Sequence, residues 1–184
     1  MKNYMPDILN QLTENSKKVS TDEMGRFIEQ IKGAKHIFLA GAGRSGVPVK
    51  GFANRLLHLG FSVSVVGEIS APRSKAGDLL LLCSGSGETG GLINLAKKAK
   101  SNNVNIALIT TARDSSLGKL ADVILLLPGI PKEDNRRDAS QFSQPMGTSF
   151  EQLAFLTCDN MVLNLMDDLN ETSATMFQRH TDLE

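Results

Sequence analysis

The chain has 184 residues, which is the length of one ordinary domain and enough to bury a sizeable hydrophobic core. Its 20 basic and 20 acidic side chains balance to a formal net charge of zero, which gives no bulk electrostatic reason to bind nucleic acid or an anionic membrane. The N-terminal stretch has no apolar signal core, and no apolar run is long enough to span a bilayer, so we expect a cytoplasmic protein.

The first 33 residues predict two helices. Pro6 suits the start of the first helix, in which Ile8, Leu9 and Leu12 share one face. Ser20 and Glu23 form a capping-box pattern at the start of the second helix. Apolar residues then follow at helical spacing, and a glycine suits the end of the helix: Met24, Phe27, Ile28, Ile31 and Gly33.

Short apolar runs then alternate with helical stretches from residue 35 to residue 127. Strands are predicted at 36–40, 61–66, 78–83, 105–110 and 122–127, and helices at 46–59, 90–100 and 116–121. The strand segments are continuous apolar runs, which is typical of parallel strands covered on both faces. The alternation indicates βαβ units. We therefore predict an α/β fold, with a five-stranded parallel sheet flanked by helices in a single doubly wound domain.

The C-terminal third of the chain begins with a polar segment at 128–147 that contains charges, prolines and glycines. A loop of that length is usually functional or mobile. A final long helix is predicted from Thr148 past Leu165, followed by a short polar helix or tail. The expected organisation of the single domain, 1–184, is N-terminal helices at 1–33, a sheet core at 35–127 and C-terminal helices at 148–184.

A loop rich in serine and glycine, residues 84–90, follows the third predicted strand. Ligands of open α/β sheets bind beyond the carboxyl ends of the strands, where this loop lies. Ser84, Ser86 and Thr89 offer hydroxyl groups, the glycines allow close approach of the backbone, and the next helix offers unpaired N–H groups. This pattern predicts a phosphate site. The alternative is that Thr89 or Ser86 only caps the helix.

The loop after the first predicted strand, residues 41–46, matches the dinucleotide-binding pattern GxGxxG, and Glu68 lies near the expected acidic position. The serine-rich loop after a later strand argues against dinucleotide binding, because a dinucleotide-binding fold does not require such a loop. Under the phosphate hypothesis Ser45 adds a hydroxyl to the site. Arg44 either contacts the ligand or pairs with another group on the surface.

On these residues the chain resembles the sugar isomerase (SIS) domain family, whose fold is flavodoxin-like. The motifs AGAGRSG (40–46) and CSGSGET (83–89) carry the resemblance, and QPMGTSFEQ (144–152) and the ending ETSATMFQRHTDLE (171–184) narrow it to the 6-phospho-3-hexuloisomerases. The resemblance implies interconversion of D-arabino-hex-3-ulose 6-phosphate and D-fructose 6-phosphate through a cis-enediol. It also implies a tetramer with sites near subunit contacts, and a metabolic link to a hexulose-phosphate synthase that fixes formaldehyde in the ribulose monophosphate pathway.

The resemblance also implies roles for individual residues. The expected substrate and phosphate-binding residues are Ser45, Ser84, Gly85, Ser86, Gly87, Glu88 and Thr89. Since a carboxylate beside a phosphate would repel it, the Glu88 side chain is expected to point away or to contact sugar hydroxyls. The catalytic base is expected to be Glu151. The alternative for Glu151 is a structural one, because Thr148 and Glu151 also match a capping box.

His180 is the second catalytic candidate, because the ordinary pKa of histidine suits proton transfer. It would serve its own subunit or a neighbouring one, and the alternative is a solvated tail residue. Cys83 and Cys158 show no ligand spacing and are expected to be buried thiols, so no metal and no cofactor are expected. Two other functions stay open: a non-catalytic phosphosugar sensor and an isomerase of another sugar phosphate.

Overall fold

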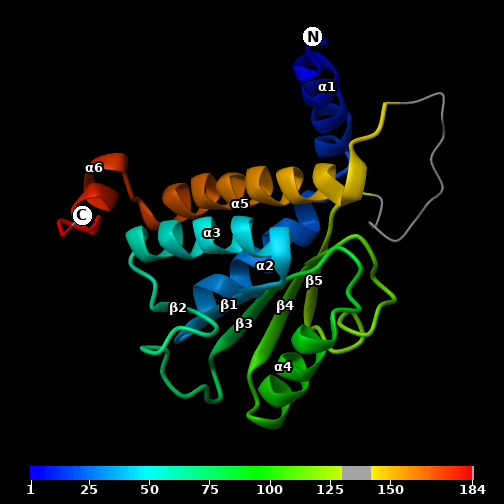
Figure 1. Ribbon diagram of the computed structural model, residues 1–184. Helices are drawn as coiled ribbons and strands as arrows, with labels where there is room; N and C mark the ends of the chain where they lie inside the picture. Colours follow the sequence, from blue (N-terminus) through cyan, green and yellow to red (C-terminus); the bar gives the residue numbers. More distant parts are fainter. Residues whose placement is uncertain (130–141, 184) are drawn as a thin grey trace.

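The computed structural model describes residues 1–129 and 142–183. Within them, five parallel strands form one sheet in the order β2-β1-β3-β4-β5 (Figure 1). The strands are β1 (Ile37–Gly41), β2 (Val63–Val65), β3 (Leu79–Cys83), β4 (Asn105–Thr110) and β5 (Val123–Leu126). This topology confirms the predicted doubly wound α/β fold.

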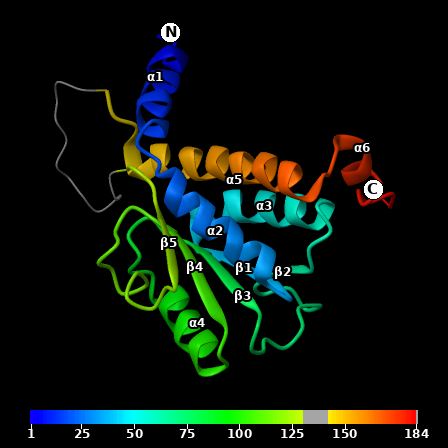
Figure 2. The same ribbon diagram turned by 180° about the vertical axis from the view of Figure 1, so that it is seen from behind.

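The helices form a layer on each face of the sheet. They are α1 (Met5–Ser16), α2 (Thr21–Gly33), α3 (Gly46–His58), α4 (Gly90–Ser101), α5 (Thr148–Leu169) and α6 (Ser173–Phe177), with short 3-10 turns η1 (Gly43–Ser45) and η2 (Pro145–Gly147). Figures 1 and 2 show α2, α3 and α5 over one face and α4 over the other. Helix α1 extends outward from the end at which α5 begins, and α6 lies beyond the other end of α5.

The strands divide their side chains between two hydrophobic cores. Leu39, Leu81 and Ile109 are fully buried beneath α2, α3 and α5, whereas Leu80 and Leu108 belong to the core on the α4 side. This division follows from the two-residue repeat of a strand. Burial of one such side chain stabilises the fold by about 1.5–3 kcal/mol. The same repeat directs the last residue of β3 toward α5, beneath the pocket described below.

The start of α2 follows the predicted capping pattern only in part. The Ser20 hydroxyl accepts a hydrogen bond from the Glu23 N–H at 3.3 Å, as predicted. The Glu23 carboxylate instead accepts the N–H of Leu126 at 2.9 Å and pairs with Arg113. Glu23 therefore ties α2 to β5, a long-range role that the local pattern does not reveal.

The predicted short helix at 116–121 is wrong, because this segment is a series of turns. The Leu117 N–H donates to the carbonyl of Gly87 at 3.0 Å, which draws the segment toward the loop after β3. Gly118 is so close to the Arg113 carbonyl that a side chain there would collide with it. The strand predicted at 61–66 is also shorter, since only Val63–Val65 pairs with β1.

The remaining segments fall largely within the expected ranges. Helices α1 and α2 lie within 1–33, the sheet lies within 35–127, and α5 and α6 lie within 148–184. Most of the long loop predicted at 128–147, residues 130–141, lies outside the described residues. In the part of the chain that the structure describes, no helix is both long and apolar enough to cross a membrane.

The turn after β1 leaves no room for a side chain at Gly41. A Cβ atom there would lie 2.6 Å from the Ser45 carbonyl oxygen and 2.9 Å from the Gly46 Cα. We predict that Gly41→Ala lowers the free energy of unfolding by about 1–3 kcal/mol, as other overpacked sites do. Urea denaturation measures this change.

Gly25 provides the matched control, because it lies in α2, is exposed, and has no atom within 4 Å of the position its Cβ would take. Gly25→Ala should raise the free energy of unfolding by roughly 0.5–1 kcal/mol, since alanine is the better helix former. Equal effects of the two substitutions would contradict the close contact at Gly41.

Candidate functional site

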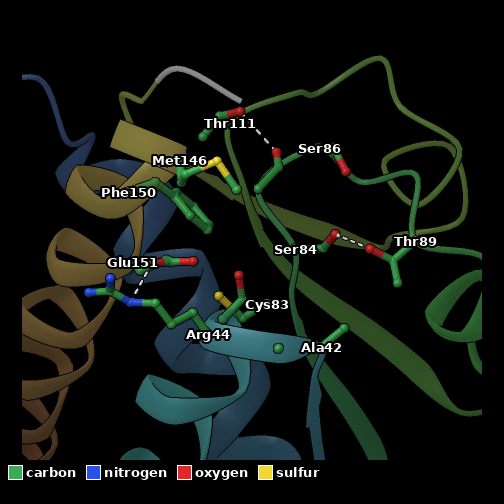
Figure 3. Close-up of a pocket in the computed structure, with 14 residues that line it drawn as sticks. Ala42, Arg44, Cys83, Ser84, Ser86, Thr89, Thr111, Met146, Phe150 and Glu151 are labelled. Atoms are coloured by element: carbon green, nitrogen blue, oxygen red, sulfur yellow. Dashed lines mark hydrogen bonds and ion pairs between the residues drawn. The ribbon is translucent and has the colours of Figure 1, made fainter. Parts of the chain in front are cut away.

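A pocket with a volume of about 180 Å³ opens where the carboxyl ends of β1 and β3 meet the first turn of α5 (Figure 3). Helix α3 leaves β1 toward one face of the sheet and α4 leaves β3 toward the other, so the pocket lies at the switch point of the doubly wound fold. The lining comes from the loops after β1, β3 and β4 and from the start of α5: Ala42, Gly43, Arg44, Ser45, Cys83, Ser84, Gly85, Ser86, Thr89, Thr111, Met146, Gly147, Phe150 and Glu151.

One wall of the pocket is the loop after β3, which contains the predicted phosphate-binding hydroxyls. Ser84 Oγ accepts the N–H of Gly87 at 3.2 Å and lies 3.4 Å from the hydroxyl oxygen of Thr89 (Figure 3). Thr89 is the N-cap residue of α4, but among the described residues its side chain makes no capping hydrogen bond. The structure therefore does not support the alternative in which Thr89 only caps the helix.

The same loop is fixed against β4. The Gly85 carbonyl accepts hydrogen bonds from the hydroxyls of Thr110 (3.0 Å) and Thr111 (2.9 Å), and from the Thr111 N–H (3.1 Å). These hydrogen bonds hold the loop against β4, with Ser84, Ser86 and Thr89 at the pocket. Hydroxyl groups together with the N-terminus of α4 suit a phosphate, as predicted from the sequence.

Two residues of this loop, Gly87 and Glu88, do not line the pocket, so their expected contact with the substrate stays a prediction. Gly87 has a φ of +67° and faces Ser115. The Glu88 carboxylate accepts the N–H of Ser116 at 2.7 Å. Hydrogen bonds from the Ser116 side chain and backbone hold the pKa of Glu88 below its ordinary value. Both residues therefore shape the loop from behind, and the expectation that the Glu88 side chain points away agrees with this geometry.

Glu151 lies on the opposite wall, in the first turn of α5, and its carboxylate points into the pocket (Figure 3). Its Oε2 atom is 2.8 Å from Nε of Arg44, which extends from η1. The Glu151 side chain is 14% exposed and that of Arg44 is 60% exposed. An ion pair with so exposed a partner contributes about 1 kcal/mol or less. Arg44 therefore does form an ion pair, but with a carboxylate that lines the pocket, and its contact with a ligand stays a prediction.

The start of α5 does not form the capping box considered from the sequence. Gly147 is the N-cap residue, and Thr148 lies inside the helix, where its hydroxyl donates to the Pro145 carbonyl at 2.6 Å. Met146 has a φ of +59° and Gly147 a φ of +72°, so two successive residues are left-handed. This turn directs the first residues of α5 into the pocket. The sequence analysis did not single out Met146 as a pocket residue. The signal that could have identified it is its place in the motif QPMGTSFEQ.

The floor of the pocket includes Cys83, the last residue of β3, which is fully buried. Burial, and to a lesser extent the negative charge of Glu151, raises the pKa of the Cys83 thiol to about 12. Burial also raises the pKa of the Cys158 thiol well above its ordinary value. Both cysteines are unbonded thiols, as the sequence predicted, and both stay protonated at neutral pH.

His180 lies far from the pocket of its own chain. It follows α6, beyond the end of α5 opposite to Glu151 (Figure 1). The 22 residues of α5 span roughly 33 Å at the usual helical rise. The His180 ring stacks on that of His58, at the end of α3, with 5.2 Å between ring centroids. The structure therefore brings Ser45, Ser84, Gly85, Ser86, Thr89 and Glu151 together and leaves His180 apart.

Glu68, the candidate acidic residue of a dinucleotide site, does not line the pocket. The Glu68 carboxylate accepts the N–H of Val65 at 3.2 Å and so stabilises the turn after β2. The pocket is smaller than typical cofactor pockets of about 300–1,000 Å³, which favours a compact ligand. Across 1–129 and 142–183, no group of three or more His, Cys, Asp or Glu side chains is placed to hold a metal ion.

Comparison with known proteins places these observations in a family. The SIS domain model matches residues 30–154. A Bacillus subtilis protein named 3-hexulose-6-phosphate isomerase is 44% identical over 98% of this chain and 97% of its own, and a Mycobacterium gastri protein of the same name is 35% identical over 99% and 90%. A solved structure from Methanococcus jannaschii, whose reported function is inferred as 3-hexulose-6-phosphate isomerase, superposes with a TM-score of 0.83 at 33% identity and covers 98% of both chains.

The buried thiols give a direct test of the pocket floor. We predict that neither cysteine of the folded protein reacts with Ellman's reagent at pH 8, because both are buried and the pKa of Cys83 is about 12. Absorbance of the released thiolate measures the reaction. Both thiols should react after denaturation in guanidinium chloride. Fast reaction of one thiol in the native protein would contradict a closed floor.

Proposed function

This chain belongs to the SIS domain family, and we propose that it is an isomerase that interconverts D-arabino-hex-3-ulose 6-phosphate and D-fructose 6-phosphate. The predicted family membership is confirmed by the matched model and by relatives that align over nearly the whole chain. The observation that supports this proposal best is one carboxylate, that of Glu151, across a compact pocket from a loop of serine and threonine hydroxyls. The enzyme would act after a hexulose-phosphate synthase, in the cytoplasm.

The reaction needs a base at one end of the substrate and a grip on the phosphate at the other. A base removes the proton from C2 of the 3-ketose, leaves a cis-enediolate across C2 and C3, and returns the proton to C3. The proton of the O2 hydroxyl is transferred to O3 in the same sequence, so the atoms balance without a redox partner. We assign the base to Glu151 and the grip to Ser84, Ser86 and Thr89.

The packing around Glu151 supports this division of roles. The preceding residue, Phe150, is 3% exposed, and its ring packs against Gly85, where a Cβ atom would lie 3.3 Å from the ring. The first turn of α5 is thereby held against the phosphate loop. Binding energy from the phosphate can then position the reacting carbons against the base. Ser45 adds a hydroxyl beside Arg44 at the mouth of the pocket.

We also propose that His180 serves the pocket of a neighbouring copy in a homo-oligomer, which the family resemblance suggests is a tetramer. Large apolar side chains are exposed on α1 and α5: Leu9 is 55% exposed, Leu156 51% and Leu163 61%. Such side chains are typical of surfaces that associate. Since α5 separates His180 from its own pocket, association is the route by which it would reach one.

We predict that the protein in D2O, without added metal or nicotinamide, incorporates deuterium at C3 of D-fructose 6-phosphate and forms the 3-ketose with deuterium at C2. Glu151→Gln should lower kcat by about 10³-fold while substrate still binds, because the amide cannot accept the proton. NMR follows the exchange, and calorimetry follows the binding. Glu68→Gln is the control, since Glu68 lies outside the pocket lining.

Three other outcomes would each point elsewhere. Binding of the sugar phosphate without exchange would favour a phosphosugar sensor. Exchange only with a different sugar phosphate would change the substrate. Near-normal activity of Glu151→Gln would remove this carboxylate from the mechanism.

The role of His180 is tested by mixing two inactive chains. We predict that His180→Ala and Glu151→Gln are each inactive, and that co-expression restores about one quarter of the activity if each site combines two chains at random. The measurement is kcat per site of the co-expressed protein, compared with that of the wild type and of each variant alone. No recovery on mixing would contradict a site shared between subunits, and full activity of His180→Ala alone would make the residue a solvated one.

A further inference from the structure

Arg44 contacts the carboxylate to which the proposed function assigns the base. Its Nε atom is 2.8 Å from Oε2 of Glu151, and its Nη1 atom lies 3.5 Å from the Thr148 hydroxyl (Figure 3). Among the described residues that line the pocket, the ionisable side chains are those of Arg44, Cys83 and Glu151, and the thiol stays neutral. Within this described lining, the charged side chains are therefore the two members of this ion pair.

The two members of the pair differ in freedom. Glu151 is 14% exposed in the first turn of a helix that packs along α3, whereas the Arg44 side chain is 60% exposed on a short turn. Water screens so exposed a pair, which makes it weak and easy to break. Arg44 is thus the partner that can move, and Glu151 is the partner that stays.

The pair also creates a chemical problem for the proposed reaction. A guanidinium beside a carboxylate favours the ionised form, which keeps the carboxylate ready but makes it a poorer proton acceptor. The reaction itself develops negative charge on O2 and O3 of the substrate as the carbon-bound proton leaves. A guanidinium offers a planar fork of N–H donors that matches two neighbouring oxygen atoms.

We propose that Arg44 holds Glu151 ionised and oriented in the empty pocket. When the sugar phosphate binds, the Arg44 side chain moves, and its guanidinium donates hydrogen bonds to O2 and O3 of the substrate instead. This inference rests on the proposed function and adds a catalytic residue to it. The transfer takes the guanidinium of Arg44 away from the base only when a substrate is present, and it places that charge where the enediolate forms. Arg44 exchanges no proton: the proton passes from C2 to Glu151 and back to C3.

Two substitutions separate the two tasks of Arg44. We expect Arg44→Gln to lower kcat by about 10²-fold, the usual loss when one donor to a developing oxyanion is removed. KM should change much less, because the phosphate loop is intact. The acid limb of the kcat/KM profile, which reports the free enzyme, should move to higher pH, because the carboxylate loses its cationic neighbour. Arg44→Lys keeps the charge, so its acid limb should stay near that of the wild type while kcat falls.

Arg113 supplies a matched control. It pairs with Glu23, and the exposed fractions of these two side chains, 47% and 15%, are close to those of Arg44 and Glu151. Neither residue lines the pocket. Arg113→Gln should leave kcat and the pH profile unchanged, and it measures the general effect of losing an arginine-glutamate pair on stability.

A measurement without turnover separates this inference from the proposed function. Carboxyl ¹³C NMR of the free protein, with the Glu151 signal assigned by its loss in Glu151→Gln, should give a higher titration midpoint in Arg44→Gln than in the wild type. Equal titration midpoints of Glu151 in the two proteins would contradict the claim that Arg44 holds this carboxylate ionised. A kcat of Arg44→Gln within about threefold of the wild type would overturn the transfer to the substrate. Failure of the wild type to isomerise the sugar phosphate would instead overturn the proposed function and leave the midpoint result intact.

Discussion

The parallel pairing of β1 with β3 is the constraint on which the site depends. In their register Gly41 lies beside Cys83, so the two strands end at the same level and the loops that follow them begin side by side. Gly41 also lets the chain turn tightly against Ser45 and Gly46. Helices α3 and α4 then diverge to opposite faces of the sheet, and the pocket lies between the two loops. The first turn of α5 completes the pocket.

The pocket separates a neutral end from a charged end. The loop after β3 presents hydroxyl groups and the start of α4, which suit a phosphate without a lysine or arginine side chain. The charged pair, Arg44 and Glu151, lies across the pocket from that loop. A sugar phosphate that spans the pocket would thus have its phosphate held by dipoles and its reacting carbons beside the titrating groups. Phe150 joins the two ends, because it packs against Gly85 and directly precedes Glu151.

Helix α5 has different roles along its length. Its first turn supplies Glu151, its buried face contributes Leu153, Met161 and Leu165 to the core, and its exposed face carries Leu156 and Leu163. The far end leads to α6, and just after α6 Arg179 pairs with the Glu171 carboxylate at 2.8 Å. Arg179 also donates to the His58 carbonyl at 2.8 Å, which docks the C-terminal segment on the end of α3 (Figure 2). Helix α5 therefore contributes both to the pocket, through Glu151, and to the surface proposed for association with other copies, through Leu156 and Leu163.

The sequence alone determined the parts of this protein that depend on local pattern. Continuous apolar runs indicated the buried parallel strands, and Ser20 marked the start of α2. The loop from Ser84 to Thr89, for which the sequence predicts a phosphate site, contributes to the lining of a pocket. These features follow from hydrophobic periodicity, capping and loop chemistry, which neighbouring residues express together.

Only the tertiary structure decided which distant side chains meet. It paired Arg44 with Glu151, turned Glu88 toward Ser116, and carried His180 to the far end of α5. It also placed turns where a helix was predicted at 116–121, and there the Leu117 N–H donates to the carbonyl of Gly87. The direction of a side chain is set by the packing of elements far apart in the chain, and that packing leaves no mark on the spacing of residues within a loop.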